Sequence, residues 1–329
     1  MIRVSGKVLG LGVVAASAVV LVVALYAAGG APKPLSAGLT GAGTPVSWAV
    51  PVLRLLADLA AIGTGGAVLA AAWLLPATKN LGAQGLRACQ DGAVAAGVWA
   101  VASIGGLLAT ASVILGVPLS QLASRAGDAG SLNQVRALAV SVVLTAFLAV
   151  LLSGCRTVAT ARVALVLTAV ALAGPLLTGH GAIARTAFWS MLATASLVVH
   201  VFCATAWIGG LGSLIRYGRE KAVERFSRLA LVCAIAIGAT GLLTAEIHLG
   251  GREDGWSLIT QWVTTGYGVL VFAKAVAFAL LVWIGWWHRR STLPALATNQ
   301  PAAFWRLAAG ELLLMSATVG LAVALSRTP

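Results

Sequence analysis

The chain has 329 residues, of which 60% are hydrophobic and only 9% are charged, and its mean hydropathy is +0.97. Soluble domains do not have this composition, so the sequence predicts an integral membrane protein. The formal net charge is +13, but the basic residues do not form the soluble surface with interspersed aromatic residues that a nucleic-acid-binding protein would have. We therefore expect no nucleic-acid partner and interpret the charge as favouring contact with anionic lipid.

Long apolar runs recur along the chain, and a bilayer core of about 30 Å is crossed by about 20 helical residues. The first run fits a transmembrane helix or a signal anchor, since Arg3 and Lys7 precede it. The fifth run is short and is expected to end at Gly174-Pro175. The runs lie at about 8–28, 48–75, 92–117, 135–155, 163–178, 188–213, 229–249, 266–287 and 302–325.

The basic residues between these runs predict the orientation of the protein. With the N-terminus inside, fourteen Lys and Arg residues fall on the cytoplasmic side and six on the outer side. Because basic residues are retained in the cytoplasm, we expect an N-in, C-out arrangement. The expected fold class is all-α, a polytopic transmembrane bundle of about nine spans in a bacterial inner membrane. We divide it into a first helix or anchor at 1–28, a four-span bundle at 29–178 and a second four-span bundle at 179–329.

The connections between the runs are short, and none contains a Walker-type phosphate-binding loop. ATP hydrolysis and a soluble catalytic domain are therefore not expected within this chain. We interpret the protein as a carrier or binding protein and not as an enzyme.

Several charged residues fall inside the apolar runs. Arg54 and Asp58 stand one helical turn apart in the second run and can neutralise one another. Lys274 lies in the eighth run, Glu246 near the outer end of the seventh, and Glu311 midway along the ninth. Charged groups in hydrocarbon are costly and mark either an ion pathway or a structural pair between helices. Both interpretations remain open for these residues.

The sixth run contains one histidine, His200, which lies about 18 Å from the start of the run at 1.5 Å per helical residue. Cys203 and Trp207 follow three and seven positions later, which places all three on one helix face. Burial favours the neutral imidazole, and imidazole with thiol suits Cu(I). The alternative is a histidine that bonds to a neighbouring helix, with Gly209 and Gly210 allowing close packing.

The other three cysteines, Cys89, Cys155 and Cys233, form no CxxC motif with one another. We interpret them as small buried hydrophobic residues.

The segment HVFCATAWIGGL, from His200 to Leu211, resembles the signature of the copper resistance protein D (CopD) family. In that family a membrane-embedded histidine is followed seven residues on by tryptophan and then by a glycine pair. Two more stretches are similar: Gly179-His180-Gly181, and Thr265 to Arg290 with Tyr267-Gly268, Lys274 and a terminal Arg pair. The final segment, from Glu311, is similar to the junction where actinobacterial CopD-like domains continue into a CtaG-like cytochrome oxidase assembly domain.

The resemblance implies copper passage across the inner membrane, with a periplasmic copper-binding protein as partner, or copper delivery toward a CtaG-like domain or respiratory oxidase. On this basis His180, Glu246 and His248 receive the ion at the outer face. His200, with or without Cys203, holds the ion in transit. The residues that set local charge or line the pathway are Lys274, Arg54, Asp58, Trp207 and Glu311.

Two alternatives remain. A membrane cytochrome would hold haem between two imidazoles at similar depth, but His248 and His288 are expected near opposite surfaces and only His200 lies deep. A scaffold subunit of a respiratory complex would use the glycine-rich helix faces for packing and bind no metal.

Overall fold

The structure is a computed structural model, and in the part of the chain that it describes the regular elements are helices, joined by turns and one isolated β-bridge between Asn80 and Thr157. That part comprises residues 6–33, 41–75, 77–179, 187–218, 220–249, 262–287, 290 and 301–328. Within it, nine helices are long and apolar enough to cross a membrane, which confirms the predicted all-α polytopic bundle. Such helices imply a lipid bilayer as the surroundings of the protein.

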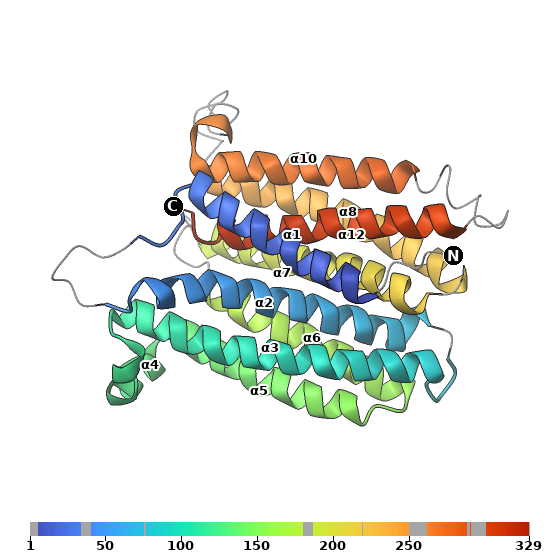
Figure 1. Cartoon of the computed structure of the whole chain (residues 1–329), viewed down its shortest axis with the longest axis horizontal. Helices are drawn as coiled ribbons and strands as arrows, with labels where there is room; N and C mark the ends of the chain where they lie inside the picture. Colours follow the sequence, from blue (N-terminus) through green and yellow to red (C-terminus); the bar gives the residue numbers. More distant parts are fainter. Residues whose placement is uncertain are drawn as a thin grey trace.

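The nine long helices of the described residues follow one another along the chain (Figure 1). A π-helix, η1 (Ala70–Leu74), ends α2, and short helices η2 (Leu119–Gln121), η3 (Ala123–Arg125) and α4 (Ala126–Ser131) lie between α3 and α5. The long helices are α1 (Gly6–Ala27), α2 (Thr44–Leu69), α3 (Ala83–Leu115), α5 (Asn133–Ser153), α6 (Val158–Gly179), α7 (Ala187–Tyr217), α8 (Glu220–Leu249), α10 (Gly266–Trp287) and α12 (Pro301–Leu325).

Several helices run beyond the apolar stretches that predicted them, and α8 begins at Glu220 and not near 229. α3 begins at Ala83 and not near 92, because polar residues such as Arg87 continue the helix outside the apolar stretch. α6 continues through Pro175 to Gly179. Proline has no N–H to donate to the carbonyl four residues earlier, here that of Ala171. The Ser141 hydroxyl of α5 donates to this carbonyl instead, at 3.5 Å, so the proline is accommodated without an end to the helix.

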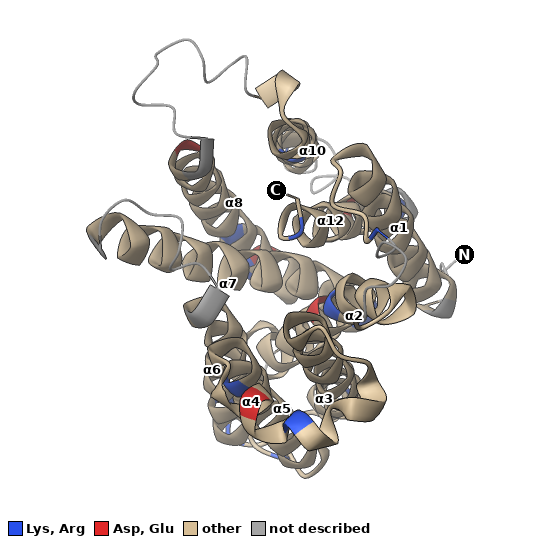
Figure 2. Cartoon of the chain, turned by 90° about the vertical axis from the view of Figure 1, so that its left-hand side faces the viewer, with Lys and Arg blue, Asp and Glu red and all other residues tan. Residues whose placement is uncertain are grey.

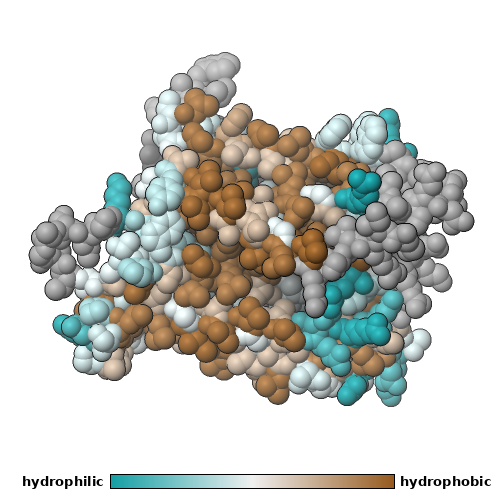
Figure 3. Space-filling view, viewed as in Figure 1, coloured by the Kyte–Doolittle hydropathy of each residue, from teal (hydrophilic) through white to brown (hydrophobic). Residues whose placement is uncertain are grey.

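The helices form two groups when the molecule is viewed along their axes (Figure 2). One group contains α2, α3, α5 and α6, and the other contains α1, α7, α8, α10 and α12. On the face shown in Figure 3, the surface between the two ends of the bundle is predominantly apolar, and polar residues gather toward the ends. This distribution matches a protein whose sides face hydrocarbon and whose ends face water.

The two groups meet where α2 crosses α7 at a pair of glycines. A Cβ atom added to Gly209 would lie 2.4 Å from the carbonyl oxygen of Ile62 and 2.8 Å from the Cα of Gly66. Only glycine allows two backbones to approach this closely. The predicted role of Gly209 in close helix packing is therefore confirmed, and the crossing fixes the position of α7.

The first and last helices of the described chain also pack closely. A Cβ atom at Gly320 of α12 would lie 2.4 Å from the carbonyl oxygen of Ser17 in α1. A Cβ atom added at Gly12 of α1 would lie 3.2 Å from the Cδ2 of Leu313 in α12. α1 is thus an integral part of the second group of helices.

Candidate functional site

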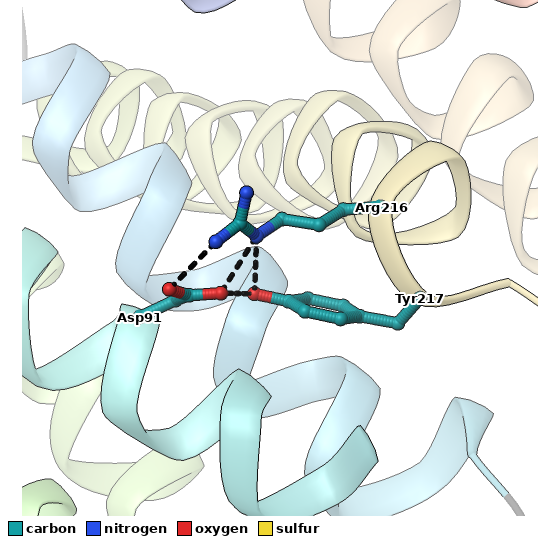
Figure 4. Close-up of polar contacts among 3 residues, drawn as sticks. All are labelled: Asp91, Arg216 and Tyr217. Carbon is teal, nitrogen blue, oxygen red and sulfur yellow. Dashed lines mark hydrogen bonds and ion pairs between the residues drawn. The ribbon is translucent and has the colours of Figure 1, made fainter. Parts of the chain in front are cut away.

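A polar cluster, which we call the Asp91 clasp, joins α3 to the end of α7 (Figure 4). Arg216 binds the Asp91 carboxylate with two nitrogens, Nε at 2.6 Å and Nη2 at 2.9 Å. The Tyr217 hydroxyl donates to the same carboxylate and accepts from Arg216 Nε at 3.0 Å. A cation in the last turn also interacts favourably with the carbonyl end of a helix. The clasp thus ties α7 to the group of α2, α3, α5 and α6.

His200 lies on α7 and is held by α8. Its Nδ1 is 2.9 Å from the Oγ1 of Thr240. That hydroxyl is also 2.6 Å from the carbonyl of Ala236, to which it can donate its single proton. In the tautomer with the ring proton on Nδ1, the proton goes to Thr240 and Nε2 keeps its lone pair. The ring is only partly buried.

Hydroxyl side chains fix how α7 lies against α8 around this histidine. Ser196, one turn before His200, donates to the carbonyl of Thr240 at 3.3 Å. It also lies 3.5 Å from the hydroxyl of Thr244. Bonds between hydroxyls and backbone across helices compensate for the missing water inside a membrane. The orientation of the His200 ring is therefore set by two helices.

Cys203 lies one turn beyond His200, and its thiol interacts with that of Cys233 across the same helix interface. Both cysteines are free, and Cys233 is 3% exposed. We had interpreted Cys233 only as a buried hydrophobic residue. A sequence pattern indicates neighbours on one helix but not which residues of two different helices face each other, so the contact between Cys203 and Cys233 is seen only in the folded structure.

Trp207 lies two turns beyond His200 and packs against Phe278 of α10. Their rings meet edge to face, with centroids 6.5 Å apart and planes at 88°. Beyond this aromatic pair lies a cavity of about 260 Å³ between α7, α8, α10 and α12. Its walls are mainly apolar. The lining also includes Ser227 and Glu311, and Glu311 is buried, with 6% of its surface exposed. The fold thus brings Trp207 and Glu311 to one cavity.

Lys274 lies on α10, one turn from Phe278, and its charge acts on the His200 ring. It is partly buried. Among the described residues, no carboxylate lies within ion-pair distance of it. Lys274 is therefore a positive charge close to the histidine, which fits the expected charge-setting position.

The other predicted charged residues are distributed as follows. Arg54 and Asp58 form the expected ion pair on α2, at 3.1 Å. Glu246 lies on α8 and is partly buried. His248 belongs to α8, but its side chain is not among those described, and His180 lies outside the described residues. The receiving cluster of His180, Glu246 and His248 remains a prediction.

Within the described residues, no group of three or more His, Cys, Asp or Glu side chains is arranged to hold a metal ion. The soft groups in this region are instead the His200 imidazole and, one turn along the helix, the thiols of Cys203 and Cys233, which do not form one group with it. Soft ligands of this kind suit Cu(I), which accepts low coordination numbers, better than Ca²⁺ or Mg²⁺, which take six or more oxygens.

Comparison with known proteins bears on the last third of the chain. Residues 220–325 match the family model of copper resistance protein D (CopD). This CopD domain includes α8, α10 and α12, with Thr240, Lys274 and Glu311, but begins after the His200 motif on α7. No curated protein and no solved structure matches the chain. The CopD-like character predicted for this region is therefore confirmed, and the junction with a CtaG-like domain remains a prediction.

Proposed function

We propose that this protein handles copper in a bacterial inner membrane, taking up the ion or delivering it toward a respiratory oxidase, without catalysis. The observation that carries the proposal is the His200 ring. Its Nδ1 contacts Thr240, a residue of the CopD domain, and the tautomer with the proton on Nδ1 keeps the lone pair of Nε2 for a metal. Neutral imidazole is a good ligand for copper.

The surrounding groups support a path for a cation through the second group of helices. His180, Glu246 and His248 receive the ion at the outer face, and His200 with Cys203 holds it in transit. The ion then passes the aromatic pair of Trp207 and Phe278 and reaches the cavity that Glu311 lines. In that cavity the carboxyl group of Glu311 is an oxygen ligand among mainly apolar walls.

The positive charge of a protonated Lys274 near His200 repels an entering cation. A positive charge near His200 raises the energy of a bound copper ion and prevents the site from becoming a trap, since conduction requires that an ion also leave. The Arg54–Asp58 pair is electrically neutral and contributes only a local dipole. We propose a periplasmic copper-binding protein and a CtaG-like domain or oxidase as partners on the two sides.

Copper accumulation in cells and copper bound to the purified protein test this proposal. We expect both to fall in His200→Ala and in His248→Ala. His288→Ala is the comparison variant, because this histidine is expected near the opposite surface and is not one of the assigned sites. Unchanged values in both test variants would refute the assigned sites.

An absorbance spectrum of the same preparation distinguishes the alternatives. A Soret band that disappears in His200→Ala would replace the copper proposal by a membrane cytochrome. Co-purification with an oxidase at zero metal content would replace it by a scaffold role.

A further inference from the structure

All four cysteines of this chain lie in two facing pairs, although they are spread over 145 residues of sequence. The thiol of Cys203 interacts with that of Cys233, and the thiol of Cys89 interacts with that of Cys155. All four are free thiols. Cys89, Cys203 and Cys233 lie on helices, and Cys155 lies two residues beyond the end of α5.

The packing of the helices independently supports the first pair. Ser196 of α7 donates to the carbonyl of Thr240 in α8, which fixes how these antiparallel helices are aligned. Seven residues on from Ser196 is Cys203, and seven residues back from Thr240 is Cys233. The two cysteines are therefore opposite one another by the same alignment that holds His200.

The second pair has a similar geometric basis. A Cβ atom at Gly92 of α3 would lie 3.4 Å from the Cδ1 of Leu152 in α5. Three residues back from Gly92 is Cys89, and three residues on from Leu152 is Cys155. The exposed fractions of these cysteines are 1% and 3%. This pair lies close to the end of the bundle, because Cys89 is about 9 Å along α3 from Ala83.

The chemistry of two facing thiols selects the ligand. Zn²⁺ in structural sites takes four ligands, and Ca²⁺ and Mg²⁺ take oxygen ligands. Within the described residues, neither pair belongs to a group of three or more metal-ligating side chains. Two thiolates without further ligands suit a soft monovalent cation of low coordination number.

We infer that the Cys203–Cys233 pair and the Cys89–Cys155 pair each bind one Cu(I) ion between two sulfurs. Binding forms two Cu–S bonds, releases the two thiol protons to solvent and leaves a complex with one negative charge. The choice of copper among soft cations rests on the proposed function, whereas the pairing of the thiols does not. The first pair extends the His200 site by one turn, and the second lies in the other group of helices, outside the CopD domain.

Titration of the reduced, full-length protein with Cu(I) in competition with bicinchoninate tests this inference. We expect two tightly bound Cu(I) ions per chain in the wild type. Cys203→Ser with Cys233→Ser should lose one ion, and Cys89→Ser with Cys155→Ser should lose the other. Each double variant is the matched control for the other, and a wild-type count in both would overturn the inference.

Copper X-ray absorption of the wild-type protein loaded with two equivalents of Cu(I) avoids any effect of substitution on folding. The expected result is two sulfur neighbours for each copper, and a shell of nitrogen or oxygen alone would overturn the inference. Failure of the proposed function has a different signature. In that case His200→Ala leaves cellular copper accumulation unchanged, while the two sulfur-bound copper ions are still found.

Discussion

Replacing Gly209 by alanine tests the helix crossing that positions α7. The added Cβ would lie 2.4 Å from the Ile62 carbonyl oxygen, whereas ordinary contact begins at 3.4 Å, so the two backbones must separate by about 1 Å. Overpacking of this kind costs about 1–3 kcal/mol, and contact with backbone atoms, which cannot rotate away, places the cost near 3 kcal/mol. The better helix propensity of alanine returns about 1 kcal/mol. We therefore expect a net loss of about 2 kcal/mol in the free energy of unfolding.

Gly97→Ala is the matched control, because a Cβ atom at Gly97 of α3 meets no other atom within 4 Å. Only the gain in helix propensity applies there, and we expect about 1 kcal/mol of stabilisation. Titration with a denaturing detergent in mixed micelles measures both variants against the wild type. The two should differ by about 3 kcal/mol, and equal stabilities would refute the crossing geometry.

Two further substitutions test the clasp and the histidine. Asp91→Asn removes the carboxylate of the Asp91 clasp and should cost about 1 kcal/mol, since the cluster is partly exposed. Glu224→Gln breaks only an exposed pair within α8 and should cost no more than about 0.5 kcal/mol in the same titration, so equal losses would contradict the clasp. Thr240→Val keeps the side-chain shape but removes the hydroxyl that holds His200, and should weaken copper binding about 10- to 100-fold in a competition assay. Thr240→Ser should bind copper like the wild type, and normal binding by Thr240→Val would show that the hydroxyl does not position the ring.

The sequence was sufficient to predict the spans, because hydrocarbon requires a long apolar stretch for each crossing. It did not predict where each helix ends. The sequence predicted that the helix ends at Pro175. In the structure the hydroxyl of Ser141, on the neighbouring helix α5, donates a hydrogen bond to the carbonyl of Ala171, which the proline leaves without its usual N–H donor. Helix ends thus depend on tertiary contacts that a local pattern does not contain.

In the candidate site, too, contacts within one helix could be predicted from the sequence, and contacts between helices could not. Arg54 and Asp58 were predicted to pair because they are one turn apart on one helix, and they do. The partners of His200 and Asp91 are 40 and 125 residues away in the chain, and no local spacing indicates them. The facing cysteines were missed for this reason. His200 itself was found because one ionisable side chain in a long apolar run is conspicuous.

The packing of Gly320 against Ser17 has a consequence for biosynthesis. About 300 residues separate these two positions, and ribosomes add about 5–20 residues per second. Some 15–60 s therefore pass between the synthesis of α1 and that of its partner α12. During this interval the face of α1 that contains Gly12 and Ser17 has no α12 to pack against. The α1–α12 contact can therefore form only after all the helices between them have been synthesised.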